Sequence, residues 1–209
     1  MYYSLASKST TSVLETQPTR VSVPPNKQGA KYTSPTIFLP DGTAVMDSRV
    51  IAAAIEERHP TPSVRLDAPQ LARLEALLPA AATPLRPLFL AHVPRTFLDE
   101  GSLEYWYRTR GEAVGRHVEE HEKANPAEGC WAAAKPGLGK ITALLQETHG
   151  PFFLGDTVSY ADLVWGSYLT FWKTLGEERF QALLRATGNE EAHLALFRGV
   201  EEWTVRNDH

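Results

Sequence analysis

Proline is distributed unevenly along this chain of 209 residues, and the distribution constrains its fold. Twelve of the 15 prolines lie at or before Pro94. Because proline interrupts helices and the ladders of central strands, the early part of the chain favours short elements joined by turns. The later part can form long helices. We therefore expect a small mixed α/β unit up to about residue 66, followed by a helical unit.

Charge and composition exclude several classes of protein. The chain has 21 Lys and Arg against 25 Asp and Glu, a net charge of −4, which argues against binding to a nucleic-acid backbone. No run approaches the roughly 18 apolar residues of a membrane span, and the first residues lack the pattern of a secretory signal. Cys130 is the single cysteine, so no intrachain disulfide can form. We expect a cytoplasmic protein.

The first unit is expected to contain strands, a hairpin and one helix. Residues 18–25 alternate polar and apolar side chains between prolines, which predicts a half-buried strand. Two β-rich runs flank a Pro-Asp-Gly turn, so residues 36–46 predict a β-hairpin. Asp47 and Ser48 then offer side-chain oxygens that can cap a helix, and apolar residues recur behind them at helical spacing. The next prolines are expected to end that helix.

The second unit begins with a predicted helix near Asp67, with Pro69 tolerated in its first turn. Ser102 is expected to cap a longer helix that continues to about Ala124. A further apolar stripe predicts a helix that ends at Gly150.

Ser159 and Asp162 resemble a capping box, with Asp in the position usual for Glu. Residues 163–172 are apolar on nearly every face, which predicts the central buried helix of the unit. Helices at about 176–187 and 190–206 are expected to complete it.

Three motifs suggest chemistry but are better explained without it. Residues 117–121 (HVEEH) match a zinc-protease pattern, but the segment also fits a charged amphipathic helix and no further metal ligand stands out. Residues 137–140 (GLGK) resemble part of a phosphate-binding loop, but Ala134 and Ile141 replace the required Gly and Ser or Thr. Cys130 has no obvious activating base. We expect no metal site and no nucleotide site here.

A different cluster of residues suits a ligand that resembles an amino acid. Pro35 begins a predicted inner strand, a position that favours a special peptide bond such as a cis one. A cis bond would turn the backbone N–H and C=O of Ser34 outward. The helix start at Asp47 and Ser48 offers N–H groups to a carboxylate and an acceptor to an ammonium group. The residues alone also fit an ordinary hairpin with an ordinary N-cap.

The order of segments along the chain resembles the glutathione transferase superfamily. Residues 32–62 match the family's strand–turn–strand–helix segment, and residues 151–169 match its buried capping box and central helix. Residues 85–115 resemble a fungal subgroup often found in secondary-metabolite pathways. The resemblance implies an α+β/α fold, with an abbreviated thioredoxin-like, glutathione-binding domain at residues 1–62 and an all-helical, substrate-binding domain at residues 63–209.

The resemblance also implies roles for individual residues. Pro35 would be the family's cis-proline, and Ser34 would pair through its backbone with the cysteinyl part of glutathione. Asp47 and Ser48 would hold the amine and carboxylate of the γ-glutamyl part. Lys31 would meet the glycyl carboxylate, although it also fits a solvated loop lysine.

The catalytic hydroxyl and the substrate pocket are less well marked. The family places a Tyr, Ser or Cys after its first strand, where it hydrogen-bonds the glutathione sulfur, and here Ser7 and Ser9 are the nearest candidates. Only 34 residues precede Pro35, and a βαβ unit needs about 30 residues, so the sequence leaves open whether this hydroxyl is present. Residues expected to line a substrate pocket between the domains, or else to be core, are Phe89, His92, Tyr105 and Trp106.

The function implied is glutathione-dependent addition to an activated C=C bond of a small, natural-product-like electrophile. The product would be a conjugate or, if the thiol is expelled again, a cis/trans isomer. The expected partners are the small molecule and a second copy of the chain in a homodimer, with no nucleic acid and no membrane. A non-catalytic scaffold or dimerisation module with the same fold is the alternative.

Overall fold

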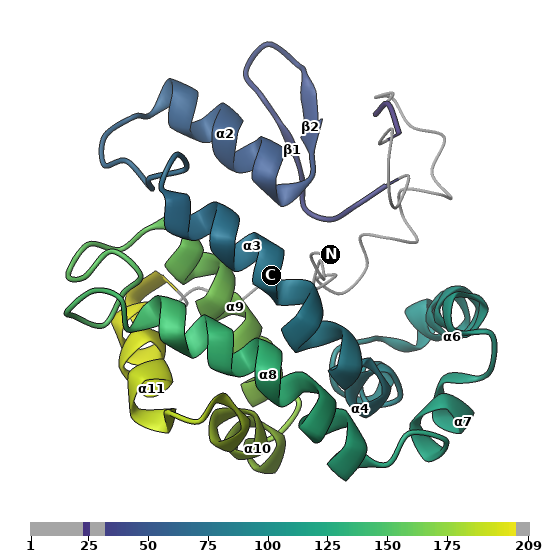
Figure 1. Cartoon of the computed structure of the whole chain (residues 1–209). Coiled ribbons are helices and arrows are strands. Elements are labelled where there is room, and N and C mark those ends of the chain that lie inside the picture. Colours follow the sequence, from purple (N-terminus) through teal and green to yellow (C-terminus); the bar gives the residue numbers. More distant parts are fainter. Residues whose placement is uncertain (1–22, 26–31, 204–209) are drawn as a thin grey trace.

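The computed structural model describes residues 23–25 and 32–203 as a small hairpin-and-helix unit set against a larger group of helices (Figure 1). The small unit consists of β1 (Thr36–Phe38), β2 (Ala44–Met46) and α2 (Ser48–Arg58). The helices of the larger unit are α3 (Pro69–Ala82), α4 (Arg86–Leu90), α5 (Val93–Thr96), α6 (Glu100–Val114), α7 (Val118–Lys123), α8 (Ala127–Leu145), α9 (Tyr160–Thr174), α10 (Glu177–Thr187) and α11 (Glu190–Gly199). Short 3-10 turns lie at Thr83–Leu85 and Glu201–Trp203. Among the helices described, none is long and apolar enough to cross a bilayer.

The predicted hairpin at residues 36–46 is confirmed. β1 and β2 pair antiparallel with Ile37 opposite Val45. The turn closes because the Asp41 carboxylate accepts a hydrogen bond from the Thr43 N–H at 2.8 Å, and Gly42 adopts a φ of 83°, which glycine tolerates without strain. The strand predicted over residues 18–25 falls mostly outside the described residues.

The single helix predicted from Ser102 to Ala124 is wrong in its start and in its continuity. Asp99, not Ser102, is the N-cap, and its carboxylate accepts hydrogen bonds from the backbone N–H and the hydroxyl of Ser102. Gly115 then ends α6 in the left-handed region, at a φ of 71°. The chain restarts as α7 with His117 as its cap. Local apolar spacing continued across the break, so it did not reveal the change in direction.

Three other predicted helix boundaries shift. The helix expected from Asp67 begins at Pro69 with Ala68 as its N-cap, and Pro69 occupies the first turn as expected. The helix expected to reach Gly150 ends at Leu145. The last helix stops at Gly199 and not at residue 206, and a 3-10 turn follows it at Glu201–Trp203.

The central position predicted for the apolar helix is confirmed in α9. Its Trp165, Leu169 and Trp172 side chains have no exposed surface, and α9 lies behind α3 and α8 in Figure 1. The capping box expected from Ser159 and Asp162 is present at its start. These contacts make the helical unit a continuous core around α9.

The crossing of α3 and α8 depends on a glycine. A Cβ at Gly137 would lie only 2.6 Å from the backbone of Ala80 and Ala81. Each of the two helices also contains an internal proline, Pro79 in α3 and Pro136 in α8. The absence of a side chain at Gly137 therefore allows the two helix backbones to touch.

Candidate functional site

The structure brings Ser34, Pro35, Asp47 and Ser48 to one end of the hairpin. Thr36 pairs with Met46, so continuing the register by two residues sets the segment before β1 opposite the segment after β2. The Thr33 N–H lies 3.0 Å from the Met46 sulfur and holds the two segments together at this end. The peptide bond between Ser34 and Pro35 is cis, as expected from the sequence.

Asp47 has an unusual backbone conformation. Its φ of 75° and ψ of 123° lie in a region that side-chain-bearing residues rarely adopt, at a cost of about 1–3 kcal/mol. One carboxylate oxygen accepts hydrogen bonds from the Arg49 N–H at 2.9 Å and the Val50 N–H at 3.5 Å. The other oxygen has no partner among the residues described. Strain retained at such a position is a reason to look for a ligand there.

Ser48 is the first residue of α2. Within the described parts of the chain, neither its hydroxyl nor its backbone N–H makes a hydrogen bond. The N-terminus of an 11-residue helix carries a partial positive charge and unpaired N–H groups, so it favours a carboxylate. With the second oxygen of Asp47 beside it as an acceptor, this turn has the donors and the acceptor that an amino-acid zwitterion needs.

Two side chains hold this turn against the helical unit. The Tyr160 hydroxyl, at the start of α9, donates to the Ser48 carbonyl at 3.1 Å. Arg49 donates to the Leu66 carbonyl at 2.9 Å and pairs with Glu75 at 3.5 Å. Burial raises the pKa of Tyr160, so its hydroxyl remains a proton donor.

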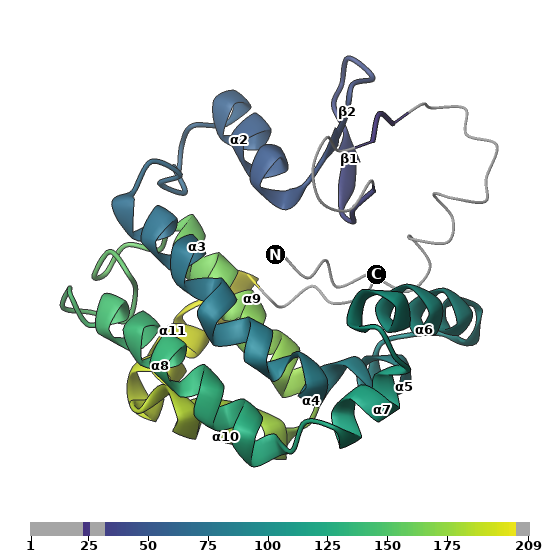
Figure 2. The ribbon, with the colours of Figure 1, turned by 45° about the vertical axis from the view of Figure 1, so that its right-hand side comes forward.

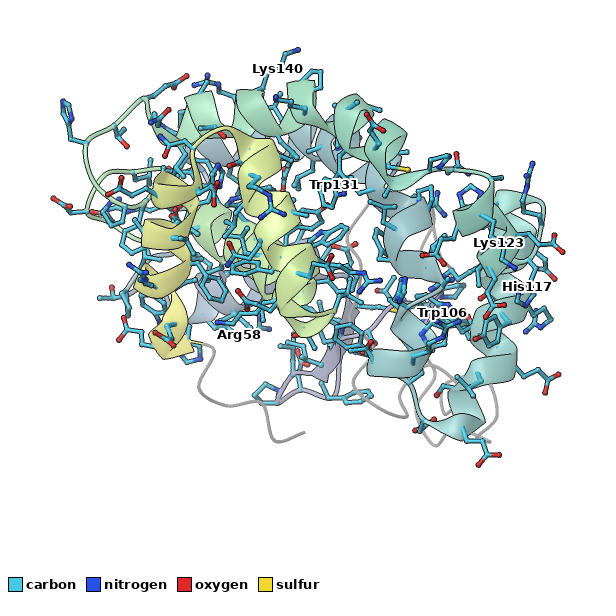
Figure 3. All side chains as sticks on the ribbon, turned by 90° about the horizontal axis from the view of Figure 1, so that it is seen from below. Arg58, Trp106, His117, Lys123, Trp131 and Lys140 are labelled. Atoms are coloured by element: carbon cyan, nitrogen blue, oxygen red, sulfur yellow. The ribbon has the colours of Figure 1, made fainter. Side chains whose placement is uncertain are left out.

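The predicted substrate residues lie on α4 to α6, at the end of the helical unit away from α11 (Figure 2). Phe89 has no exposed surface and packs edge-on against Phe171 and Trp172, so it belongs to the core. Trp106 is half-buried and donates to a main-chain carbonyl, Leu90, at 3.1 Å. Figure 3 shows Trp106 and His117 at the same end of the molecule.

The other two predicted substrate residues have polar surroundings. The His92 ring lies 2.8 Å from a Glu122 oxygen and 2.7 Å from an Arg179 nitrogen. Tyr105 is half-buried beneath the Arg108 guanidinium. His92 is therefore already engaged by a cation and an anion, and a substrate role for either residue stays a prediction.

Three predicted site residues, Ser7, Ser9 and Lys31, lie outside the described residues. Two surface hollows of about 270 and 300 Å³ lie away from the remaining predicted residues. The first is bordered by Gln146 and Ala192, and the second lies beside Pro69. Neither hollow marks the substrate pocket that the sequence predicts.

The HVEEH pattern does not form one helical face. His117 precedes α7 and accepts a hydrogen bond from the Glu119 N–H, and its ring stacks on Tyr107. His121 lies inside the helix. Cys130 is buried, and this burial raises the pKa of its thiol.

The helical unit matches a known family. A family model described as glutathione S-transferase, C-terminal domain, matches residues 68–196. The chain belongs to the glutathione S-transferase family. A comparison with curated proteins finds no match.

Solved glutathione S-transferases share the fold of this family member. One from Ceriporiopsis subvermispora, in complex with glutathione, is 24% identical with a TM-score of 0.73, and the match covers 90% of this chain and 78% of that one. A second from the same fungus, also in complex with glutathione, is 28% identical with a TM-score of 0.66 over 84% and 74% of the two chains. A glutathione transferase of Phanerochaete chrysosporium is 24% identical with a TM-score of 0.64 over 88% and 74%. The predicted fold class is thus confirmed.

Sequence reasoning on this family member missed Arg49 and Tyr160. Arg49 is part of the first turn of α2, and Tyr160 contacts that turn although it is 112 residues away from Ser48 in the chain. Arg49 directly follows the predicted site residues, but a helical arginine is usually solvated. Only the tertiary structure brings Arg49 to Leu66 and Glu75, and Tyr160 to Ser48.

Proposed function

We propose that this chain binds glutathione at the first turn of α2. In this proposal the Ser48 hydroxyl and N–H receive the γ-glutamyl carboxylate, and Asp47 accepts from the γ-glutamyl amine. The observation that carries the proposal is the strained Asp47 beside a Ser48 whose donors have no partner among the described residues. Support also comes from the 28% identical neighbour, which was solved in complex with glutathione.

The remaining glutathione contacts are proposed along the same line. The backbone of Ser34, before the cis-proline Pro35, lies at the same end of the hairpin as Ser48 and would pair with the cysteinyl part. Lys31 is proposed to meet the glycyl carboxylate, and Ser7 or Ser9 to hydrogen-bond the sulfur.

We further propose that the reaction is an addition to an unsaturated small molecule. Glutathione, when bound, supplies a thiol that adds across an activated C=C bond, sulfur to the β carbon and proton to the α carbon, and reversal after bond rotation gives the cis/trans isomer instead. This chain would bind the amino-acid end of glutathione at α2. It would orient the electrophile with residues of α4 to α6, of which Tyr105 and Trp106 are half-buried. A homodimer stays a prediction, which light scattering after size-exclusion chromatography checks.

Titration calorimetry with glutathione tests the binding site. Ser48→Ala removes a hydrogen bond to a charged group, so the Kd should rise about ten- to hundredfold. Ser167→Ala is the matched control, because Ser167 is exposed and its hydroxyl bonds only within α9. The control should bind like the wild type. No binding by the wild type, or unchanged binding by Ser48→Ala, overturns the site.

The chemistry is tested separately with glutathione and a polyene ketone, followed by chromatography. A conjugate or an isomer that forms only with both protein and glutathione supports the enzyme. Ser7→Ala and Ser9→Ala should each be compared, because loss of product in one variant identifies the hydroxyl that faces the sulfur. Glutathione binding without any thiol-dependent product points to the scaffold alternative.

A further inference from the structure

The small unit is attached to the helical unit through polar contacts. The continuous hydrophobic core contains no residue of β1, β2 or α2. In the described part of the chain, every hydrogen bond and ion pair that joins residues 32–62 to residues 63–203 involves Ser48, Arg49 or Glu56. A few polar side chains therefore join the first turn of α2 to the helical unit.

Tyr160 is one of these contact residues, and its backbone is held at the start of α9. It directly follows the capped N-terminus of α9, and its own backbone N–H donates to the Val64 carbonyl at 2.7 Å. The backbone of Tyr160 is thus held by a capped helix end and by the linker between the units. From there its hydroxyl reaches the Ser48 carbonyl at 3.1 Å.

Arg49 fixes the same turn from a second direction. Its guanidinium donates to the Leu66 carbonyl, pairs with Glu75 on α3, and lies 5.7 Å from the centroid of the Tyr160 ring. The Arg49 backbone N–H meanwhile donates to the Asp47 carboxylate. Ser48 therefore contacts the helical unit directly, and Asp47 is one hydrogen bond away from Arg49, which also contacts it.

We propose that Tyr160 is a positioning residue for the amino-acid end of glutathione. Its hydroxyl, with Arg49 stacked beside it, holds the Ser48 peptide so that the Ser48 hydroxyl and the Asp47 carboxylate face the ligand together. This role rests on the proposed glutathione site. It assigns to the helical unit a part in glutathione recognition, in addition to any contact with the second substrate.

Tyr160→Phe is the sharpest variant, because it removes the hydroxyl and keeps the ring beside Arg49. Loss of one hydrogen bond should raise the Kd and the KM for glutathione about three- to tenfold. The kcat at saturating glutathione and the KM for the second substrate should stay unchanged. Tyr107→Phe is the matched control, because the described residues offer no hydrogen bond to the Tyr107 hydroxyl, and it should bind glutathione like the wild type.

Two tests distinguish the positioning role from a role in folding alone. One compares ligands that contain different parts of glutathione, and the other is a double-mutant cycle. γ-Glutamylcysteine should show the same loss of affinity in Tyr160→Phe as glutathione, whereas cysteinylglycine, which lacks the γ-glutamyl group, should show none. In a Ser48→Ala background Tyr160→Phe should have a much smaller effect, since the hydroxyl that it positions is gone. Additive effects, or a lower Tm with unchanged glutathione affinity, overturn the positioning role.

The outcomes also separate this role from the site itself. If wild type binds no glutathione, the proposed function fails. If wild type binds and Ser48→Ala weakens binding while Tyr160→Phe does not, the site holds and the positioning role is refuted.

Discussion

The buried histidine of α11 should make this protein less stable as the pH falls below 6.5. His193 has no exposed surface. The Trp165 indole N–H, which can only donate, lies 2.8 Å from the ring Nδ1. Nδ1 must therefore be the acceptor, and Nε2–H donates to the Thr142 hydroxyl at 2.8 Å. The hydroxyl in turn donates to the Thr187 carbonyl, so the neutral ring satisfies every group.

Protonation would place a hydrogen on Nδ1, where it would face the Trp165 N–H. Burial lowers the pKa of His193 from 6.5 to about 4. Between these values the unfolded chain binds a proton that the folded protein excludes. The contribution of the neutral His193 to stability is therefore fully present above pH 6.5 and is lost as the pH falls towards 4. In this range the free energy of unfolding falls by up to about 1.4 kcal/mol per pH unit. The expected loss is about 2 kcal/mol at pH 5 and about 3 kcal/mol near pH 4.

Urea unfolding at pH 7 and pH 5 measures this loss. His193→Gln should be less stable than wild type at pH 7, but it should lose about 2 kcal/mol less between the two values. His149→Gln, at an exposed loop position, should behave like wild type. The raised pKa of Asp162, caused by burial, is common to all three proteins and cancels in the difference. Equal losses in wild type and His193→Gln, or an NMR spectrum with a protonated His193 ring at pH 5, refute the reasoning.

Three further predictions concern packing, capping and thiol reactivity. Gly137→Ala should destabilise the protein by about 1–3 kcal/mol in urea unfolding, since its Cβ meets the α3 backbone. Gly139→Ala, with open space at the same helix, should be neutral or stabilising, and equal effects would contradict this packing. Asp162→Ala should lower the free energy of unfolding by about 3 kcal/mol, because the buried carboxylate accepts from two backbone N–H groups and a hydroxyl. Ser159→Ala should lower it by about 1 kcal/mol. The reverse order in urea unfolding would argue against the carboxylate as the main cap. Cys130 should react with iodoacetamide far more slowly in the native protein than in urea, because burial shields the thiol and raises its pKa. Equal rates in the two conditions would show that the thiol is accessible in the native protein.

Local chemistry made some elements predictable. The Pro-Asp-Gly turn, the cap at Asp47, and the capping box of Ser159 with Asp162 each depend on residues within a few positions of one another. Interactions of that range are present in the sequence itself, so the hairpin, α2 and the start of α9 could be placed without a structure. The same reasoning failed at Gly115, because an apolar stripe continues across a change in chain direction.

The sequence by itself determined the order of the elements and the pair Asp47 and Ser48 at a helix start. Only the tertiary structure decided that Phe89 is core and that Tyr160 and Arg49 hold the first turn of α2. The physical reason is the range of the interactions. A cap or a tight turn is stabilised by neighbouring residues, whereas the contact between Tyr160 and Ser48 joins positions 112 residues apart and exists only once α9 packs into the core.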